Sequence, residues 1–295
     1  MAGTDGLTAT FEAHRPHLQA VAYRMLGSLS EAEDAVQETW LRLARSDTSE
    51  VRNLGGWLTT VVGRVCLDSL RARSARREDP LDVHLPDPIV SRVPESDPEQ
   101  HALAADSIGL ALLVVLDTLS PSERLAFVLH DIFAVPFDEL GSILGRSPAA
   151  AKQLASRARQ RLRGVEPGHA VDPGRHRQIV DAFLAASREG DFEALLTVLD
   201  PNVVLRADAG DGPMGPSRLV HGAPAVARQA LHFASLARFA RPVLVNGSPG
   251  LLGIADGRPF ALLSMTIRQS VIVEIDILAD PERLARLDLG ALGDR

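Results

Sequence analysis

The stretch LSPSERLAFVLHDIFAVPFDELGSILGRSPAAAKQLASRARQRLR, residues 119–163, decides the fold of the middle of this chain. Ser120 and Glu123 form a predicted capping box, and Pro121 occupies the first position of the helix that the box begins. Further along, Gly145 marks the turn between a short helix and a longer one. Two well-delimited helices joined by a tight turn predict a helix-turn-helix.

The last helix of this motif has an apolar stripe and a polar face. Its outward positions carry no acidic residue and are Lys152, Gln153, Ser156, Arg157, Gln160 and Arg163. Arginine or lysine can donate two hydrogen bonds to guanine and glutamine can pair with adenine, so we expect Lys152, Gln153, Ser156 and Arg157 to contact bases in a major groove. The competing interpretation is a solvated basic helix that only packs on its neighbours. The capped turn before the helix favours DNA binding.

Three helices are predicted before this motif. The first carries an apolar face from Phe11 and ends at Gly27, and the second, over 31–44, begins at a capping box formed by Ser30 and Glu33 and has an acidic outer face. The third begins near Trp57 and becomes basic towards its end. An aromatic residue and threonine hydroxyls beside positive charge can hold an unstacked single strand. A core position for the tryptophan and a merely solvated basic helix end are the alternatives.

Two further segments complete the chain. Residues 78–97 are acidic and rich in proline, a composition that opposes regular helix and sheet and indicates a flexible linker. After about residue 167 two helical runs precede strand-like runs at 203–207, 243–245, 260–268 and 271–278. We expect an α+β domain with an antiparallel sheet there. The fold class is therefore multidomain, with all-α parts followed by an α+β part.

Composition excludes several classes of protein. The 295 residues are 45% hydrophobic and 23% charged, as in ordinary globular proteins, and the net charge of -7 leaves DNA binding to local basic clusters. The chain lacks a signal peptide and a run of apolar residues that could span a bilayer, so we expect a cytoplasmic protein without membrane contact. A lone cysteine, Cys66, is expected to be buried filler. No metal-ligand spacing is present, and no cofactor is expected.

These residues together resemble the extracytoplasmic-function sigma factors of the sigma-70 family. The resemblance rests on the acidic helix around 32–38, the Trp57-Leu58 helix that ends in 67–71, the acidic linker, and the helix-turn-helix that begins at 119. It implies an alternative sigma factor that is not an enzyme and whose partners are core RNA polymerase, at its clamp and flap regions, and promoter DNA. Arg64 stands where many members of the family carry asparagine.

The resemblance also assigns roles to individual residues. It implies contacts with the polymerase clamp at Asp34, Gln37, Glu38 and Arg42. It implies contacts with the melted -10 element at Trp57, Thr60, Arg64, Arg71 and Arg73. It implies contacts with the -35 element at Lys152, Gln153, Ser156, Arg157 and Gln160.

The C-terminal part resembles the SnoaL-like cone fold, and sigma factors with this fusion form the SigJ-type subgroup. Three stretches carry the likeness: residues 84–88, residues 280–284, and a loose version of a glycine-rich loop at 208–212. The subgroup implies a domain that regulates sigma activity through an interface formed by Leu85, Pro86, Asp87, Pro88, Asp280, Pro281 and Arg283. The expected domains are region 2 over 8–77, the linker over 78–100, region 4 over 101–166 and the cone over 173–290.

Two other functions compete with this interpretation. A helix-turn-helix regulator whose cone senses a ligand would bind duplex operators by itself. A SnoaL-like enzyme would need pocket acids and bases, for which Asp208, His221, His232 and Asp276 are candidates. Because cones often enclose an apolar pocket, a small-molecule ligand in this domain is a further expectation.

Overall fold

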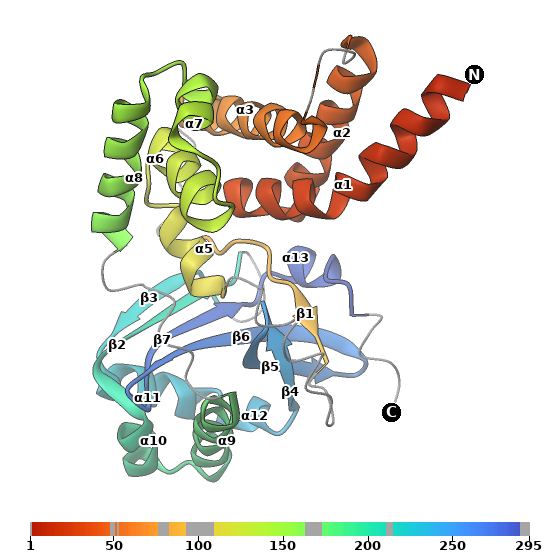
Figure 1. Ribbon diagram of the computed structural model, residues 1–295. Coiled ribbons are helices and arrows are strands. Elements are labelled where there is room, and N and C mark those ends of the chain that lie inside the picture. Colours follow the sequence, from red (N-terminus) through yellow and green to blue (C-terminus); the bar gives the residue numbers. More distant parts are fainter. Residues whose placement is uncertain are drawn as a thin grey trace. The chain divides into compact units, whose positions relative to one another are not determined.

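The computed structural model describes residues 2–47, 51, 53–75, 83–92, 109–162, 173–210 and 215–289. Figure 1 shows the course of the chain, which divides into two compact units. The helical unit comprises residues 1–79 and 115–164, and the α+β unit comprises residues 80–114 and 165–295. One of the three boundaries between the units falls within helix α5 (Leu110–Leu116). Within the described ranges, every helix is too short or too polar to cross a bilayer.

The helical unit begins with α1 (Ala2–Leu26), α2 (Leu29–Arg45) and α3 (Leu54–Ala75), which pack against one another. The apolar face predicted for the first helix is confirmed, since Phe11, Leu18 and Met25 are wholly buried. The Phe11 ring lies 5.0 Å from the ring of Trp40 on α2. Packing of one face of each helix therefore forms this core.

Two helix starts differ from the prediction. Helix α2 is capped by Ser28, whose hydroxyl accepts from the amide of Glu31, so the capping box predicted at Ser30 is wrong. Ser28 has the extended backbone that a cap requires, whereas Ser30 already lies inside the helix. Helix α3 begins at Leu54 because the side chain of Asn53 accepts from the amide of Gly56 at 3.0 Å. This cap offsets the low helix propensity of the glycines at that end.

The helix-turn-helix consists of α6 (Pro121–Ala126), a π-helical turn η1 (Phe127–Ile132), α7 (Phe137–Leu144) and α8 (Pro148–Leu162). The predicted capping box is confirmed: the Ser120 amide donates to Glu123 at 3.1 Å, and the Glu123 amide donates to the Ser120 hydroxyl. Gly145 has a φ of 64°, which suits glycine, and ends α7. A Cβ at Gly141 would lie 2.8 Å from the carbonyl oxygen of Arg146, so only glycine allows this close turn.

Helix α3 also packs on α6 and α7, which brings the segments expected as region 2 and region 4 into one compact unit. A Cβ at Gly63 would lie 3.1 Å from the Leu129 side chain. Arg124 is 2% exposed and donates to the carbonyl of Arg24 while it pairs with Asp117. Both contacts of the buried arginine satisfy its charge within this unit.

The α+β unit is built on a seven-stranded sheet of order β1-β4-β5-β6-β7-β2-β3. The strands are β1 (Val90–Ser91), β2 (Leu199–Asp208), β3 (Arg218–His221), β4 (Ala240–Val245), β5 (Ser248–Ala255), β6 (Arg258–Arg268) and β7 (Val271–Leu278). All neighbours are antiparallel except β2 and β7, which are parallel. The expectation of an antiparallel sheet is wrong at that pair, whose two strands are connected through β3, two helices and β4 to β6 rather than by a hairpin.

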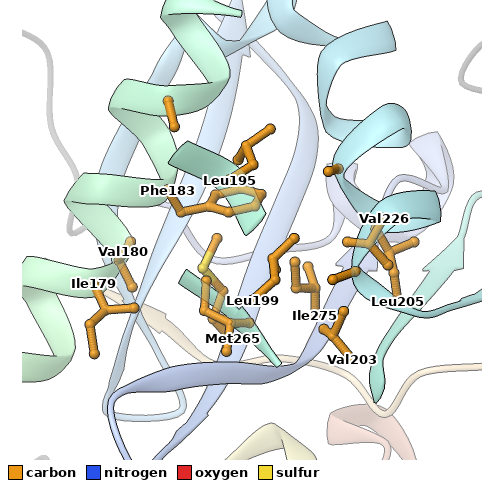
Figure 2. Close-up of a cluster of buried hydrophobic side chains, with 14 of the residues drawn as sticks. Ile179, Val180, Phe183, Leu195, Leu199, Val203, Leu205, Val226, Met265 and Ile275 are labelled. Carbon is orange, nitrogen blue, oxygen red and sulfur yellow. The ribbon is translucent and has the colours of Figure 1, made fainter. Parts of the chain in front are cut away.

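Helices α9 (Pro173–Glu189), α10 (Phe192–Val198), α11 (Ala223–His232) and α12 (Ala234–Ala237) cover one face of this sheet (Figure 1). Their apolar side chains and those of the sheet form the core that Figure 2 shows, in which Phe183, Val226 and Ile275 point toward one another. A short helix, α13 (Pro281–Ala285), follows the last strand. The predicted α+β architecture is confirmed.

Within the described part of the linker, residues 83–92, the expectation that regular helix and sheet are absent is wrong only at Val90 and Ser91. Val90 and Ser91 form β1, which pairs with Val245 and Leu244 of β4. Leu85 is wholly buried within the same unit. An edge strand two residues long places no proline inside the ladder, so the prolines do not prevent it. The remainder of the predicted linker, 78–82 and 93–100, lies outside the described residues.

Candidate nucleic-acid interface and linker contacts

Helix α8 presents the polar face that its sequence predicts. Ala151, Leu154, Ala155, Ala158 and Leu162 are buried, and all five proposed contact residues are exposed, namely Lys152, Gln153, Ser156, Arg157 and Gln160. Arg163, the sixth outward residue of the prediction, lies outside the described residues. The face therefore has the donors that base edges and phosphates require.

The remaining arginines of α8 are engaged by acidic side chains. Arg161 donates to Glu123 at 2.7 Å, and Arg159 lies 3.5 Å from Asp131. Burial alone would raise the pKa of Glu123, but the Ser120 hydroxyl and amide and the charges of Arg161 and Arg157 lower it below its usual range. Glu123 therefore stays ionised, caps α6 and holds α8 against it.

The residues predicted for the -10 element lie along α3 in different environments. Trp57, Thr60 and Arg73 are half-buried, and Arg64 and Arg71 are exposed. Arg64 donates to the carbonyl oxygen of Ser142 on α7 at 3.0 Å, and Arg73 forms an ion pair with Glu31 of α2. Trp57, Thr60, Arg64 and Arg71 follow one face of α3 at the i, i+3, i+7 and i+14 spacing, whereas Arg73 lies on another face. Arg71 lies 3.9 Å from Asp68, so three of the five already have partners inside the helical unit.

The residues predicted for the polymerase clamp share one face of α2. Asp34 and Gln37 are exposed, and the half-buried Glu38 accepts from Arg42 at 2.9 Å. Leu41 lies on the same face, at the i, i+3, i+4 and i+7 spacing that begins at Asp34, and is 39% exposed. Sequence reasoning missed this leucine, although the spacing alone would have placed it beside the other four.

The linker residues and the C-terminal motif meet within the α+β unit. Arg283 of α13 donates to the Leu85 carbonyl at 2.6 Å, to Asp87 at 2.9 Å and to Asp208 at 2.5 Å. Asp280 caps α13 by accepting from the amides of Glu282 and Arg283, and Pro281 occupies the first helical position. The structure thus joins Leu85 and Asp87 to Arg283. Leu85, Pro86 and Pro88 are buried, and Asp280 and Pro281 begin the helix that carries Arg283.

Two central residues of this contact were absent from the predicted interface. Asp208 is 6% exposed and accepts from the Leu85 amide at 3.0 Å, with the imidazole of His84 3.4 Å away. The side-chain oxygen of Asn246 accepts from the Ile89 backbone amide at 3.0 Å, and the backbone amide of Asn246 donates to the Ile89 carbonyl. Burial alone would raise the pKa of Asp208, but hydrogen bonds from His84 and Leu85 and the charge of Arg283 lower it. Asp211 and Gly212 of the loose loop motif lie outside the described residues.

The four candidate acids and bases of an enzyme do not converge. The apolar cavity of this unit is lined by Ala207 and Ile275, whose neighbours Asp208 and Asp276 point to the opposite face of the sheet. His221 ends β3, and His232 lies on the outer surface of α11. None of the four lines the cavity.

Asp276 is instead part of a buried ionic cluster. It is 2% exposed, accepts from Arg206 at 2.9 Å, and shares that arginine with Glu274. Burial and the negative charge of Glu274 raise the pKa of Asp276 to about 7, although Arg206 opposes the shift. The folded protein therefore binds a proton here that the unfolded chain has released above about pH 4.

A pH dependence of stability follows from this cluster. Because folding raises the pKa of Asp276, the protonated carboxyl contributes fully to the free energy of unfolding below the pKa that it has in the unfolded chain. This contribution is lost as the pH rises towards 7, at a rate on the order of 1 kcal/mol per pH unit. We predict that Asp276→Asn removes this slope and makes the α+β unit more stable than the wild type at pH 8. Both tryptophans, Trp40 and Trp57, lie in the helical unit, so tryptophan fluorescence does not report unfolding of the α+β unit. The stability of that unit is therefore measured by hydrogen exchange of the amides of β6 and β7 over a range of pH. Equal slopes in both proteins would contradict the assignment.

The described part of the chain contains side chains that can ligate metals and one free cysteine, Cys66. Across the described ranges, no three histidine, cysteine, aspartate or glutamate side chains gather to hold a metal ion. Cys66 is wholly buried on α3, and burial raises the pKa of its thiol to about 12. It therefore remains a protonated, apolar side chain.

Two family models match segments that lie wholly or mostly in the helical unit, and other known proteins match nearly the whole chain. The Sigma-70 region 2 model matches residues 10–76, and the Sigma-70, region 4 model matches residues 109–162. The chain is 36% identical over 297 residues to the probable ECF RNA polymerase sigma factor SigI of Mycobacterium tuberculosis, covering 98% of this chain and 99% of that protein. It is 38% identical to the ECF RNA polymerase sigma factor SigJ of the same organism, covering 92% and 91%. The crystal structure of M. tuberculosis SigJ matches with a TM-score of 0.75 and 35% identity, covering 96% of this chain and 99% of that one.

Proposed function

Because this chain belongs to the extracytoplasmic-function sigma factors of the sigma-70 family, we propose that it binds core RNA polymerase and directs initiation at its promoters. The observation that carries the proposal is the exposed face of α8, where five polar or basic side chains follow a capped helix-turn-helix. We assign this face to the -35 element and α3 to the melted -10 element, both read in the cytoplasm.

The packing of α3 on α6 and α7 has a consequence for the -10 assignment. Arg64 donates to Ser142 of the helix-turn-helix, so a contact of Arg64 with DNA competes with this hydrogen bond between α3 and α7. We infer that polymerase separates these helices. The separation breaks the hydrogen bond of Arg64 with Ser142 and parts the two helices at Gly63, where an added Cβ would lie 4.0 Å from the Ile143 side chain.

The polymerase contact is assigned to the outer face of α2. A leucine that is 39% exposed between charged side chains adds apolar area to a surface that otherwise supplies charge, and burial of such a side chain drives association. We therefore add Leu41 to Asp34, Gln37, Glu38 and Arg42.

Leu41 provides the test of this surface. We predict that Leu41→Ala weakens binding to core polymerase free of other sigma factors by about 1–2 kcal/mol, or about 5- to 30-fold in dissociation constant. Fluorescence anisotropy of the labelled chain measures it. Leu29→Ala is the matched control, because Leu29 is 45% exposed at the start of the same helix on a different face. If the two variants bind equally well, the α2 assignment is wrong.

We further infer that the α+β unit regulates the sigma regions through the linker rather than by catalysis. The linker joins the two sigma regions in sequence, and Arg283, Asp208 and Asn246 hold its residues 84–90. A docked linker limits the distance that regions 2 and 4 can span, because fewer residues remain free between them. Release of these contacts would lengthen the tether, so the strength of the docking sets how readily both regions reach a promoter.

A further inference from the structure

The α+β unit encloses a small cavity between its sheet and helices α9, α11 and α12. The cavity has a volume of about 110 Å³, and its walls are almost entirely apolar. Phe183, Leu205 and Ile275, which Figure 2 labels, are among its lining residues. Ser187, Arg218 and Gln229 are the polar side chains of the described lining, and the Ser187 hydroxyl donates to the Phe183 carbonyl. Polarity is therefore concentrated at Arg218 and Gln229.

A hollow on the surface of the same unit meets the cavity at this polar end. Arg218, Gln229 and Phe233 line both spaces. The hollow is further lined by Arg228 and His232, which are exposed and lie four residues apart on α11. Among the described residues that line it, none is acidic. The hollow therefore places the side chains of Arg218 and Arg228 next to an apolar cavity.

The boundary between the two spaces is formed by an arginine and an aromatic ring. The guanidinium carbon of Arg218 lies 5.4 Å from the centroid of the Phe233 ring, a cation–π arrangement that holds the arginine at the polar end. A molecule that fits both spaces must present an apolar body to the cavity and negative charge to Arg218 and Arg228. Guanidinium groups bind carboxylates through charge-assisted hydrogen bonds.

We propose that the α+β unit binds a short-chain carboxylic acid, with its alkyl group in the cavity and its carboxylate at Arg218 and Arg228. An engineered cavity of about 150 Å³ accepts benzene, so this smaller space suits an alkyl group of about four or five carbons. The site lies within the α+β unit alone, so the binding does not depend on the proposed interaction with polymerase.

Calorimetric titration of the full chain with hexanoate tests the proposal. We expect saturable binding of hexanoate at millimolar or lower concentration, and binding of hexanamide and acetate that is at least about tenfold weaker, because one lacks the charge and the other the alkyl group. Equal binding of hexanoate and hexanamide, or no saturable binding of hexanoate, overturns the proposal.

Two variants and their controls locate the ligand. Arg228→Gln should weaken hexanoate binding about tenfold, whereas Arg258→Gln, at an exposed arginine outside the hollow, should leave it unchanged. Ala230→Leu should abolish binding by filling the cavity, whereas Ala234→Leu, at another half-buried helical alanine that does not line it, should not. Both sites are helical, where leucine is well tolerated. Unchanged binding in both Arg228→Gln and Ala230→Leu places the ligand elsewhere and refutes the site.

Discussion

Replacing Arg283 with methionine is expected to lower the free energy of unfolding of the α+β unit by about 3 kcal/mol. The side chain of Arg283 is 14% exposed, and it is the cation that faces Asp208, whose side chain is 9% exposed. Without the guanidinium, Asp208 keeps its buried charge with fewer donors, and the Leu85 carbonyl loses a hydrogen bond. Hydrogen exchange under native conditions measures the change in the amides of β2, of β7 and of Leu85, Asp87 and Ile89.

Arg286→Met is the matched control for this prediction. Arg286 follows the same short helix, but its side chain is 78% exposed and lies 3.9 Å from an equally exposed Glu282. An exposed pair of this kind contributes little, so the control should behave as the wild type. If the linker amides are equally protected from hydrogen exchange in Arg283→Met and in Arg286→Met, Arg283 does not hold the linker. A loss confined to residues 85–89 would show that docking and unit stability are separable.

Replacing Arg157 with alanine is expected to weaken use of the -35 element by about 1–3 kcal/mol and to relax the base preference at one position. Arg157 is exposed on α8, so its removal should leave the folded helical unit unchanged. Transcription from a library of promoters randomised over the -35 element measures both effects. Arg161 is less suitable, because its ion pair with Glu123 would change the packing of α8.

Arg258→Ala is the control for the -35 prediction, since it removes an equally exposed arginine from a hairpin of the α+β unit. It should preserve both promoter output and base preference. A uniform loss across all promoters for Arg157→Ala would indicate a phosphate contact instead of base reading. Unchanged output would contradict the assigned face of α8.

The helix-turn-helix was predictable because its signals are local. The reciprocal hydrogen bonds of Ser120 and Glu123 and the left-handed backbone at Gly145 depend on neighbours within a few residues. The apolar stripe of α8 repeats at helical spacing, so its outward face followed directly. The start of α2 was predicted two residues too late, because Ser28 and Ser30 are both suitable capping residues. Only Ser28 has the extended backbone of a cap.

The α+β unit was less predictable because its decisive contacts are distant in sequence. Strand β1 has two residues and pairs with Val245 and Leu244, a partner that no local pattern identifies. Strand β5 was missed because it contains Pro249 and Gly253, residues that usually interrupt strands. A Cβ at Gly253 would lie 2.5 Å from the Phe260 ring, so the glycine is required by cross-strand packing.

Asp208 shows the same limit for the candidate site. From the sequence, Asp208 could be an acid or base of an enzyme pocket or the first residue of the subgroup's loop motif at 208–212. Only the parallel pairing of β2 with β7 establishes that Ala207 faces the cavity, and that Asp208 therefore faces Leu85 and Arg283. The side on which a strand residue lies depends on register, and register here depends on a partner about seventy residues later in the chain.

Run-off transcription with the purified chain and core polymerase that lacks any other sigma factor tests whether this chain directs initiation. Two helical surfaces, α3 and α8, are proposed to read one promoter while polymerase holds them through α2. We expect initiation at defined start sites that depends on Arg157 and is reduced by Leu41→Ala. Binding of duplex DNA by the chain alone, with no transcript from any promoter in the library, would contradict it and would indicate an independent operator-binding regulator.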